Sequence, residues 1–195
     1  MKKALLILAA LVAVLAVLPA TPAAGAYNVL LAGGPEGNRI HIFLTPDGRK
    51  YVIESVVPLE VGGEVCVHPE GHENELVCDA PQIASFEVNS GAGEDIVSVT
   101  PTVPVPVTMR GGPHRDLLIG GGGADKLIGG SDNDRLIGGA EGDALFGGQG
   151  ADFLSGGGGA DLLIGGPDKD LLRGGPGRDA EIQETRTAAK PKLPR

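Results

Sequence analysis

Residues 120–130 read GGGGADKLIGG, and this stretch holds one full copy of the unit that decides the fold. Eight nine-residue units follow one another without a gap from residue 111 to residue 182. Gly stands at positions one and two and Asp at position six in all eight units, whereas Leu stands at position eight in every unit except the last. Columns that keep phase in this way identify an internal repeat, in which neighbouring units stack on one another.

The last three residues of each unit predict a short strand that follows a glycine-rich turn. Side chains alternate across a strand, so position eight faces one side while positions seven and nine face the other. Glycine at positions one, two and often four permits positive φ and a close approach of stacked backbones. Stacking therefore predicts a continuous thin core made by one column of leucines: Leu118, Leu127, Leu136, Leu145, Leu154, Leu163 and Leu172.

The acidic column predicts bound cations. Its members are Asp116, Asp125, Asp134, Asp143, Asp152, Asp161, Asp170 and Asp179. Neighbouring strands lie ~4.8 Å apart, and two unit charges at ~4 Å repel by about 1 kcal/mol in water and by more beside protein. An aligned column would open the stack unless cations lay between the carboxylates. Carboxylate and carbonyl oxygens in a flexible set suit Ca²⁺ better than Mg²⁺.

These units resemble the GGxGxDxUx repeats of the RTX, or hemolysin-type calcium-binding, family over residues 111–182. The resemblance implies an all-β fold, a right-handed parallel β-roll with two repeats in each coil, preceded by a small β-rich segment. It also implies that calcium is shared between repeats n and n+2. Six acid pairs follow: Asp116 with Asp134, Asp125 with Asp143, Asp134 with Asp152, Asp143 with Asp161, Asp152 with Asp170, and Asp161 with Asp179.

Backbone carbonyls at positions two and four complete the implied ligand sets, for up to six ions. The candidates are Gly112, Gly121, Gly123, Gly130, Asp132, Gly139, Gly148, Gly150, Gly157, Gly159 and Gly166. The terminal pairs fit least well, because the last repeat lacks its Leu and the first has His114 at position four.

Residues 27–110 predict a β-rich segment with hairpins, because short Val/Ile/Tyr-rich runs alternate with Pro-Asp-Gly and Gly-Gly turn signals. Residues 90–98 form a ninth copy with Asp95 at position six, but the step to Asp116 is 21 residues, so this copy is out of phase with the array. Residues 33–41 are a weaker echo with Asn38 in the acid's place. VTPTVPVPVTMR, residues 99–110, predicts an edge strand or an extended lead-in, because its prolines lack donors.

Cys66 and Cys78 enclose His68 and His72, which leaves two interpretations. The spacing C-x-H-x3-H-x5-C offers four ligands to zinc. In a secreted protein, the same two cysteines more often form a disulfide that closes a short loop.

The first 26 residues predict a cleaved secretory signal peptide: Lys2 and Lys3, an apolar run over residues 4–18, and an A-x-A ending at residues 24–26. The alternative is a membrane anchor, but a bilayer span needs ~20 apolar residues. Losing both lysines makes the net charge of −9 more negative by two units. Such acidity argues against nucleic-acid binding and favours cation binding or solubility. Residues 183–195 predict a disordered basic tail.

No catalytic motif stands out, so the sequence predicts a secreted, non-enzymatic calcium-binding protein whose repeats fold when calcium binds outside the cell. The alternatives are a cell-surface adhesion or spacer module, and a truncated relative of an RTX enzyme or toxin. The N-terminal signal favours the general secretory route over the C-terminal signal common in that family. One outward apolar column is a possible docking face, unless the N-terminal segment covers it: Ile128, Phe146, Ile164 and Ile182.

Overall fold

The computed structural model describes residues 13–14, 17–19, 27–56, 59–60 and 66–184. These residues form β-strands and a single three-residue 3₁₀ helix, η1 (Ala80–Gln82), so the described chain is all-β as predicted. The signal peptide predicted over residues 1–26 lies almost entirely outside this description. No helix in the described residues is long and apolar enough to cross a membrane.

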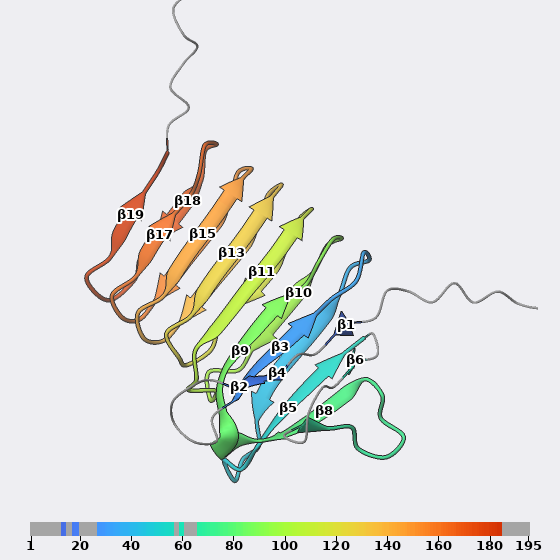
Figure 1. Cartoon of the computed structure of the whole chain (residues 1–195). Coiled ribbons are helices and arrows are strands. Elements are labelled where there is room, and N and C mark those ends of the chain that lie inside the picture. The colour runs from blue at the N-terminus through green and yellow to red at the C-terminus, as the bar shows by residue number, and fades with distance from the viewer. Residues whose placement is uncertain (1–12, 15–16, 20–26, 57–58, 61–65, 185–195) are drawn as a thin grey trace, which may run out of the picture.

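The strands form two long sheets that face each other, with a separate two-stranded pair, β1 (Ala13–Val14) and β6 (Leu59–Glu60) (Figure 1). One sheet has nine strands in the order β18-β16-β14-β12-β10-β4-β5-β8-β7. Its members are β18 (Leu171–Arg173), β16 (Phe153–Gly157), β14 (Arg135–Gly139), β12 (Leu117–Ile119), β10 (Ile96–Val99), β4 (Arg39–Leu44), β5 (Lys50–Ser55), β8 (Glu75–Asp79) and β7 (Cys66–Val67).

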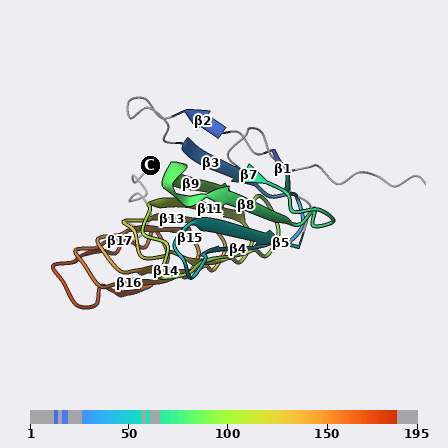
Figure 2. The same ribbon diagram turned by 90° about the horizontal axis from the view of Figure 1, so that it is seen from below.

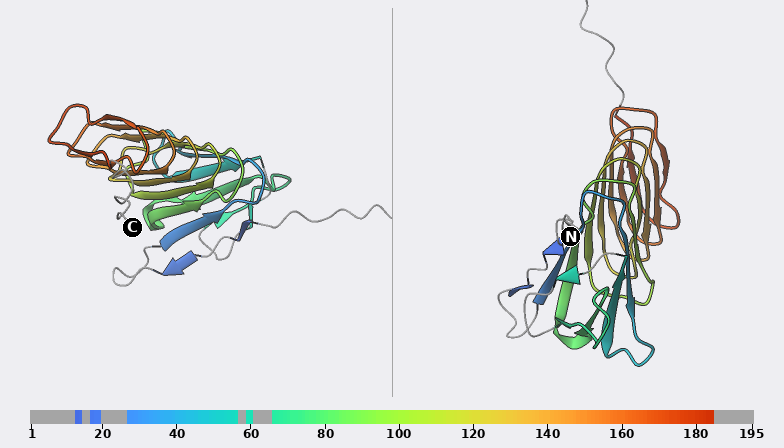
Figure 3. Two further views of the ribbon diagram at one scale, coloured as in Figure 1. Left: turned by 90° about the horizontal axis from the view of Figure 1, so that it is seen from above. Right: turned by 90° about the vertical axis from the view of Figure 1, so that its right-hand side faces the viewer.

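The second sheet has eight strands in the order β19-β17-β15-β13-β11-β9-β3-β2. Its members are β19 (Ala180–Ile182), β17 (Leu162–Ile164), β15 (Ala144–Gln149), β13 (Lys126–Ser131), β11 (Val107–Pro113), β9 (Ile83–Asn89), β3 (Tyr27–Ala32) and β2 (Val17–Pro19). From β9 onward the chain alternates between the two sheets, and each strand pairs in parallel with the strand one coil away. Figures 2 and 3 show the resulting flattened coil, with one sheet on each face and the turns along both edges. The predicted parallel β-roll is confirmed.

The register places identical repeat positions side by side, which builds the predicted leucine column. Leu118 pairs with Leu136 and Leu136 with Leu154 in one sheet, while Leu127 pairs with Leu145 in the other. Six of the seven predicted core leucines are fully buried, and Leu172 in the last coil is partly buried against them. Burial of a leucine side chain contributes about 2 kcal/mol, so each repeat carries one modest increment of hydrophobic stabilisation.

The expected β-rich segment is present, but it continues the roll instead of standing apart from it. Strands β3, β4, β9 and β10 belong to the two long sheets, and larger side chains fill the space that single leucines fill in the repeats. Tyr51 and Phe86 meet there edge to face, with ring centroids 5.1 Å apart. Antiparallel pairs β4–β5, β5–β8 and β7–β8 extend the sheet beyond the first coil, so the expected hairpins lie at this end.

Two expectations about the lead-in are wrong. The copy at residues 90–98 is in phase with the array, because Val97 pairs with Leu118 and the three extra residues are absorbed by the irregular turn at residues 100–106. That turn also holds Pro101, Pro104 and Pro106, so β11 keeps its N–H donors up to its last residue, Pro113, and is an interior strand between β9 and β13 instead of an edge strand. The three prolines of the turn interrupt no ladder hydrogen bond.

Candidate metal centre

Two columns of turns run along the two edges of the roll, and each turn ends in the residue at position six. The longer column contains, in order along the stack, Asn38, Asp95, Asp116, Asp134, Asp152 and Asp170. The shorter column contains Asp125, Asp143, Asp161 and Asp179. The parallel register of the strands that follow these turns fixes the alignment, because each turn enters its strand at the same repeat position.

Each carboxylate bridges two coils through its Oδ1 atom. The backbone N–H of Asp116 donates to Oδ1 of Asp134 at 2.8 Å, and the N–H of Asp134 donates to Oδ1 of Asp152 at 2.7 Å. The other four predicted pairs make the same bond at 2.8–3.1 Å. The structure therefore brings together all six acid pairs expected from the sequence. It adds one more, because the N–H of Asp95 donates to Oδ1 of Asp116 at 2.8 Å.

The second oxygen, Oδ2, is buried without any hydrogen-bond partner in six of these residues: Asp95, Asp116, Asp134, Asp143, Asp152 and Asp161. Each of the six side chains is at most 3% exposed. A buried acceptor without a partner forfeits its hydration, which costs about 1–3 kcal/mol and more when it is charged. Six such atoms in regular order are a feature that requires a compensating positive charge or donor.

Burial raises the pKa of these carboxyl groups in the absence of a cation. Desolvation is the main cause in each case, and it raises the pKa of Asp134 to about 8 and that of Asp143 to about 7. The charge of the neighbouring acids in the column adds to the effect. The pKa of Asp116 and that of Asp152 rise to about 6 for the same main reason. The site thus opposes ionised carboxylates unless positive charge is present.

Backbone carbonyls converge on the same gaps between coils. A Cβ atom placed on Gly130 would collide with the carbonyl oxygen of Gly112, so this position-two carbonyl points at the next coil. At position four, the carbonyl oxygen of Asp132 lies in the same way against Gly150. At position one, the carbonyl of Gly147 points back, toward Gly129 and the Oδ2 atom of Asp134. Oxygen atoms from both coils therefore surround each gap.

This donor set fits a hard cation. It consists of carboxylate and carbonyl oxygens and contains no nitrogen or sulfur, which suits Ca²⁺, an ion that takes six to eight oxygen ligands in flexible geometry. Within the described ranges, no three His, Cys, Asp or Glu side chains cluster in a way that could hold a metal. The two results agree, because most oxygen atoms at each gap come from the backbone.

Asp125 departs from its column. The N–H of Gly121 donates to its Oδ2 at 2.6 Å, and the N–H of Val107 donates to its Oδ1 at 2.8 Å. Its turn stacks on the proline-containing turn instead of a repeat, and the N–H of Gly122 donates to the carbonyl of Val103 there. Gly121 accordingly lacks the positive φ found at position two in every other repeat. Backbone donors therefore satisfy both oxygens of Asp125, and the fit to an ion that requires its Oδ2 is lost.

The predicted backbone ligands fall into three groups. The first, whose carbonyls point at the following coil, comprises Gly112, Gly121, Gly130, Asp132, Gly139, Gly148, Gly157 and Gly159. The second is Gly166, whose carbonyl accepts a hydrogen bond from Gln183. The third comprises Gly123, which lacks positive φ and lies against Val105, and Gly150, whose N–H donates to Asp168.

Several participants were missed by the sequence analysis. The position-one carbonyls were not expected, although Gly at position one is invariant and admits no Cβ there. Position four adopts positive φ without glycine in three repeats, at His114, Asp132 and Glu141, where φ is 84°, 77° and 64°. Asp168, at the same repeat position, does not adopt that conformation. A non-glycine residue at positive φ is strained, so stacking between coils fixes this conformation.

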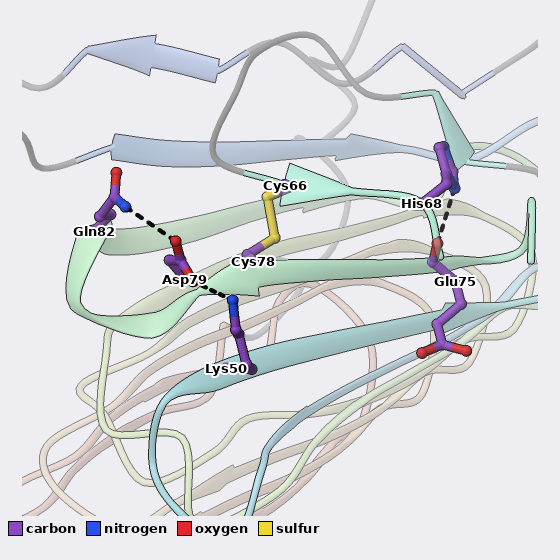
Figure 4. Close-up of a disulfide and its surroundings, with 7 residues drawn as sticks. All are labelled: Lys50, Cys66, His68, Glu75, Cys78, Asp79 and Gln82. Carbon is purple, nitrogen blue, oxygen red and sulfur yellow. Dashed lines mark hydrogen bonds and ion pairs between the residues drawn. A yellow bond between two sulfur atoms is a disulfide. The ribbon is translucent and has the colours of Figure 1, made fainter. Parts of the chain in front are cut away.

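Cys66 and Cys78 form a disulfide, so the zinc alternative is wrong (Figure 4). The two cysteines face each other across the β7–β8 pair. The Nδ1 atom of His68 is hydrogen-bonded to the carbonyl of Glu75 at 2.8 Å, and His72 lies beside the carboxylate of Glu75. The bridge links the outermost strand of the nine-stranded sheet to its neighbour, far along the sheet from the repeats.

The outward apolar column lies in register on the eight-stranded sheet, where Ile128, Phe146, Ile164 and Ile182 pair in sequence. The first three are half-buried, and Ile182 at the end of the stack is 45% exposed. The ring of Phe146 is covered in part by Lys126, whose Nζ lies 5.5 Å from the ring centroid. The N-terminal strands β3 and β9 extend this sheet at its end and so do not cover the column. Its use as a docking face stays a prediction.

Comparison with known families agrees with this geometry. Residues 110–145 and 146–180 match the RTX calcium-binding nonapeptide repeat family, described as four copies. The match coincides with the repeat array and implies calcium binding by it. No curated protein and no solved structure matched the chain.

Proposed function

We propose that this chain, whose residues 110–180 are RTX calcium-binding nonapeptide repeats, is a secreted, non-enzymatic protein whose roll folds when calcium binds outside the cell. The observation that carries the proposal is the row of six buried Oδ2 atoms without partners. Calcium bound in the gaps supplies the positive charge that these atoms lack.

The protein's own residues define what happens without the ion. Ordering a glycine-rich array is entropically costly, and the carboxyl groups with raised pKa values oppose burial in their charged form. Because each interior coil contributes only two core leucines, one from each of its repeats, the calcium-free array is expected to lack stable coils. Binding and folding are then one process, as in other domains whose ligands assemble only in the folded state.

We further propose six calcium positions, one for each unpartnered Oδ2 atom. Two differ from the positions expected from the sequence: the gap that follows Asp95 gains an ion, and the gap that follows Asp125 loses one, because backbone N–H groups already satisfy Asp125. Extracellular calcium modules bind at ~10⁻⁴–10⁻³ M. Such affinities would leave the roll folded outside cells and loose in the cytoplasm, in keeping with secretion.

A calcium titration of the chain beginning at residue 27 tests the proposal. Calorimetry is expected to give binding in the submillimolar to millimolar range, and far-ultraviolet circular dichroism a gain of strand signal as calcium replaces chelator. Magnesium at the same concentration serves as the control and should produce neither change. A chain that is fully folded in chelator and indifferent to calcium would refute the proposal.

A further inference from the structure

The longer column ends at both sides in a carboxamide instead of a carboxylate. Asn38 stands at position six of the first turn, residues 33–38, one coil before Asp95. Gln183 follows the last strand and reaches back over the last turn of the column, residues 165–170. Neither residue belongs to the repeats matched by the family.

Asn38 places a donor where the interior coils have an unpartnered oxygen. Its side chain is 1% exposed, and its backbone N–H donates to Oδ1 of Asp95 at 2.5 Å, the bond that position six makes to the next acid in the later coils as far as Asp152. Its Nδ2 atom contacts the position-four carbonyl of Glu36 at 2.5 Å and the position-one carbonyl of Ser90 at 2.9 Å. It also contacts Oδ1 of Asp95 at 3.1 Å and the position-two carbonyl of Gly34 at 3.5 Å.

These four oxygens occupy the same repeat positions as the oxygens that surround the gaps between interior coils. In an interior gap, the place of the Asn38 Nδ2 atom is taken by the Oδ2 atom of an aspartate. This oxygen is an acceptor surrounded by other acceptors, so a cation is needed to hold the oxygens of the gap together. An amide nitrogen in the same place carries two hydrogens and no acceptor function. The first gap is therefore satisfied without an ion, and neither atom of the Asn38 amide is among the buried polar atoms without partners.

Gln183 makes the matching set of contacts at the other end. Its Nε2 atom donates to the position-four carbonyl of Asp168 at 2.6 Å, to Oδ2 of Asp170 at 2.7 Å and to the position-two carbonyl of Gly166 at 3.3 Å. Its Oε1 atom accepts the N–H of Asp170 at 3.2 Å, which is the bond that Oδ1 of the next coil makes elsewhere in the column. One amide thus replaces both the next acid and the ion.

We infer that Asn38 and Gln183 substitute for calcium at the two ends of this column, so that the terminal gaps close without an ion and calcium is required only between them. The first gap joins the coil that carries the large N-terminal core, and Asn38 keeps this coil stacked on the next one in calcium-free protein. These two coils stay folded without calcium, and the exposed edges of β9 and β10 are where the repeats stack when calcium binds. This inference rests on the proposed calcium binding of the interior gaps.

Two pairs of variants of the chain beginning at residue 27 test the inference. Asn38→Asp and Gln183→Glu restore a carboxylate, and each is expected to raise the calcium stoichiometry measured by calorimetry by one. Asn38→Ala and Gln183→Ala remove the donor without adding charge and are expected to add no ion. Hydrogen exchange in chelator provides the second readout, over residues 39–44 and 96–99. The wild type should protect these amides, Asn38→Ala should lose the protection, and Asn38→Asp should regain it only with calcium.

The outcomes separate this inference from the function it rests on. If the wild type binds calcium but Asn38→Asp and Gln183→Glu both bind the same number of ions as the wild type, the inference is overturned and the proposed function stands. If amides 39–44 exchange in chelated wild type as fast as those of the interior strands, the role of Asn38 as an ion-free clamp is also overturned. A wild type that binds no calcium would overturn both proposals.

Discussion

Burial raises the pKa of Asp134 to about 8, so its charged form is strongly disfavoured in the calcium-free fold. The substitution Asp134→Asn should therefore make folding of the roll less dependent on calcium and should also remove one bound ion. The Oδ1 atom remains to accept the N–H of Asp116, which Asp134 accepts at 2.8 Å. The unpartnered Oδ2 becomes an amide nitrogen, which is the arrangement present at Asn38. The fold is therefore expected to survive, and the changes are confined to charge.

The magnitude follows from the pKa of Asp134, which burial raises from 3.8 to about 8. A group whose pKa is higher in the folded state stabilises that state below its unfolded pKa and loses this contribution as the pH rises through the folded value. At pH 7.5 nearly the whole difference is lost, which amounts to about 5 kcal/mol at ~1.4 kcal/mol for each pKa unit. Asparagine avoids this cost, so the calcium-free fold should gain up to that amount.

Hydrogen exchange of β14 and β16 in chelator at pH 7.5, together with a calcium titration, measures both effects. Asp134→Asn should show slower exchange than the wild type in chelator and should bind one ion fewer. Glu94→Gln is the matched control, because it removes one negative charge from an exposed side chain beside the same column and should change neither quantity. Unchanged exchange in chelated Asp134→Asn would refute the reasoning that buried charge keeps the calcium-free roll unfolded.

Three further predictions address the pH, the core and the disulfide. In chelator, lowering the pH from 7.5 to 5.5 should increase strand content by circular dichroism. Over this range Asp134, whose pKa rises to about 8 in the folded state, is protonated when folded but ionised when unfolded, so added protons favour folding. An unchanged strand content would contradict the raised pKa of Asp134. Leu145→Ala should lower the free energy of unfolding in calcium by about 2–5 kcal/mol, measured by urea denaturation. The control Ile182→Ala removes a side chain that is 45% exposed and should change this free energy little. Equal effects of the two substitutions would exclude a leucine core. Substituting Cys66 and Cys78 by serine should cost about 3 kcal/mol in the same assay and leave the calcium stoichiometry unchanged, whereas a loss of ions would show that the bridge supports the repeats.

The glycine, aspartate and leucine columns predicted stacked strands, a leucine core and an acidic cation site, and the family resemblance that they carry predicted the parallel roll. Three periodic constraints act together: glycine where backbones touch, leucine where the two sheets face each other, and aspartate where the turns end. Each acts between units a fixed number of residues apart, and the resemblance to the RTX family supplied the stacking of repeat n on repeat n+2 that defines the six acid pairs. The structure shows this stacking, for example in the pairing of Asp116 with Asp134.

The N-terminal residues could not be placed in this way, because their spacing is irregular. Asp95 and Asp116 are 21 residues apart in the sequence, yet their coils stack regularly in the structure. The three extra residues lie in the turn at residues 100–106, where the roll does not constrain the length of the chain. Asn38 is still farther from the repeats along the chain, beyond the hairpin strands inserted between the first two coils. Only folding of that insertion brings it beneath Asp95.

The sequence by itself therefore determined the repeat, the core column and the column of acids, because these follow from local period. Tertiary structure alone decided which acids keep an unpartnered oxygen. Asp125 is satisfied by the backbone N–H groups of Val107, which follows the proline-containing turn, and of Gly121 in its own repeat, while Asn38 and Gln183 close the ends of the longer column with amide donors. The contacts of Asn38 and Gln183 join residues whose separation in the chain does not match the coil period of 18 residues. Those of Asp125 keep the ordinary spacing but depend on how the backbone N–H groups are oriented beside the irregular turn. Only the folded arrangement of hydrogen-bond donors around each oxygen therefore distinguishes an unpartnered carboxylate from a satisfied one.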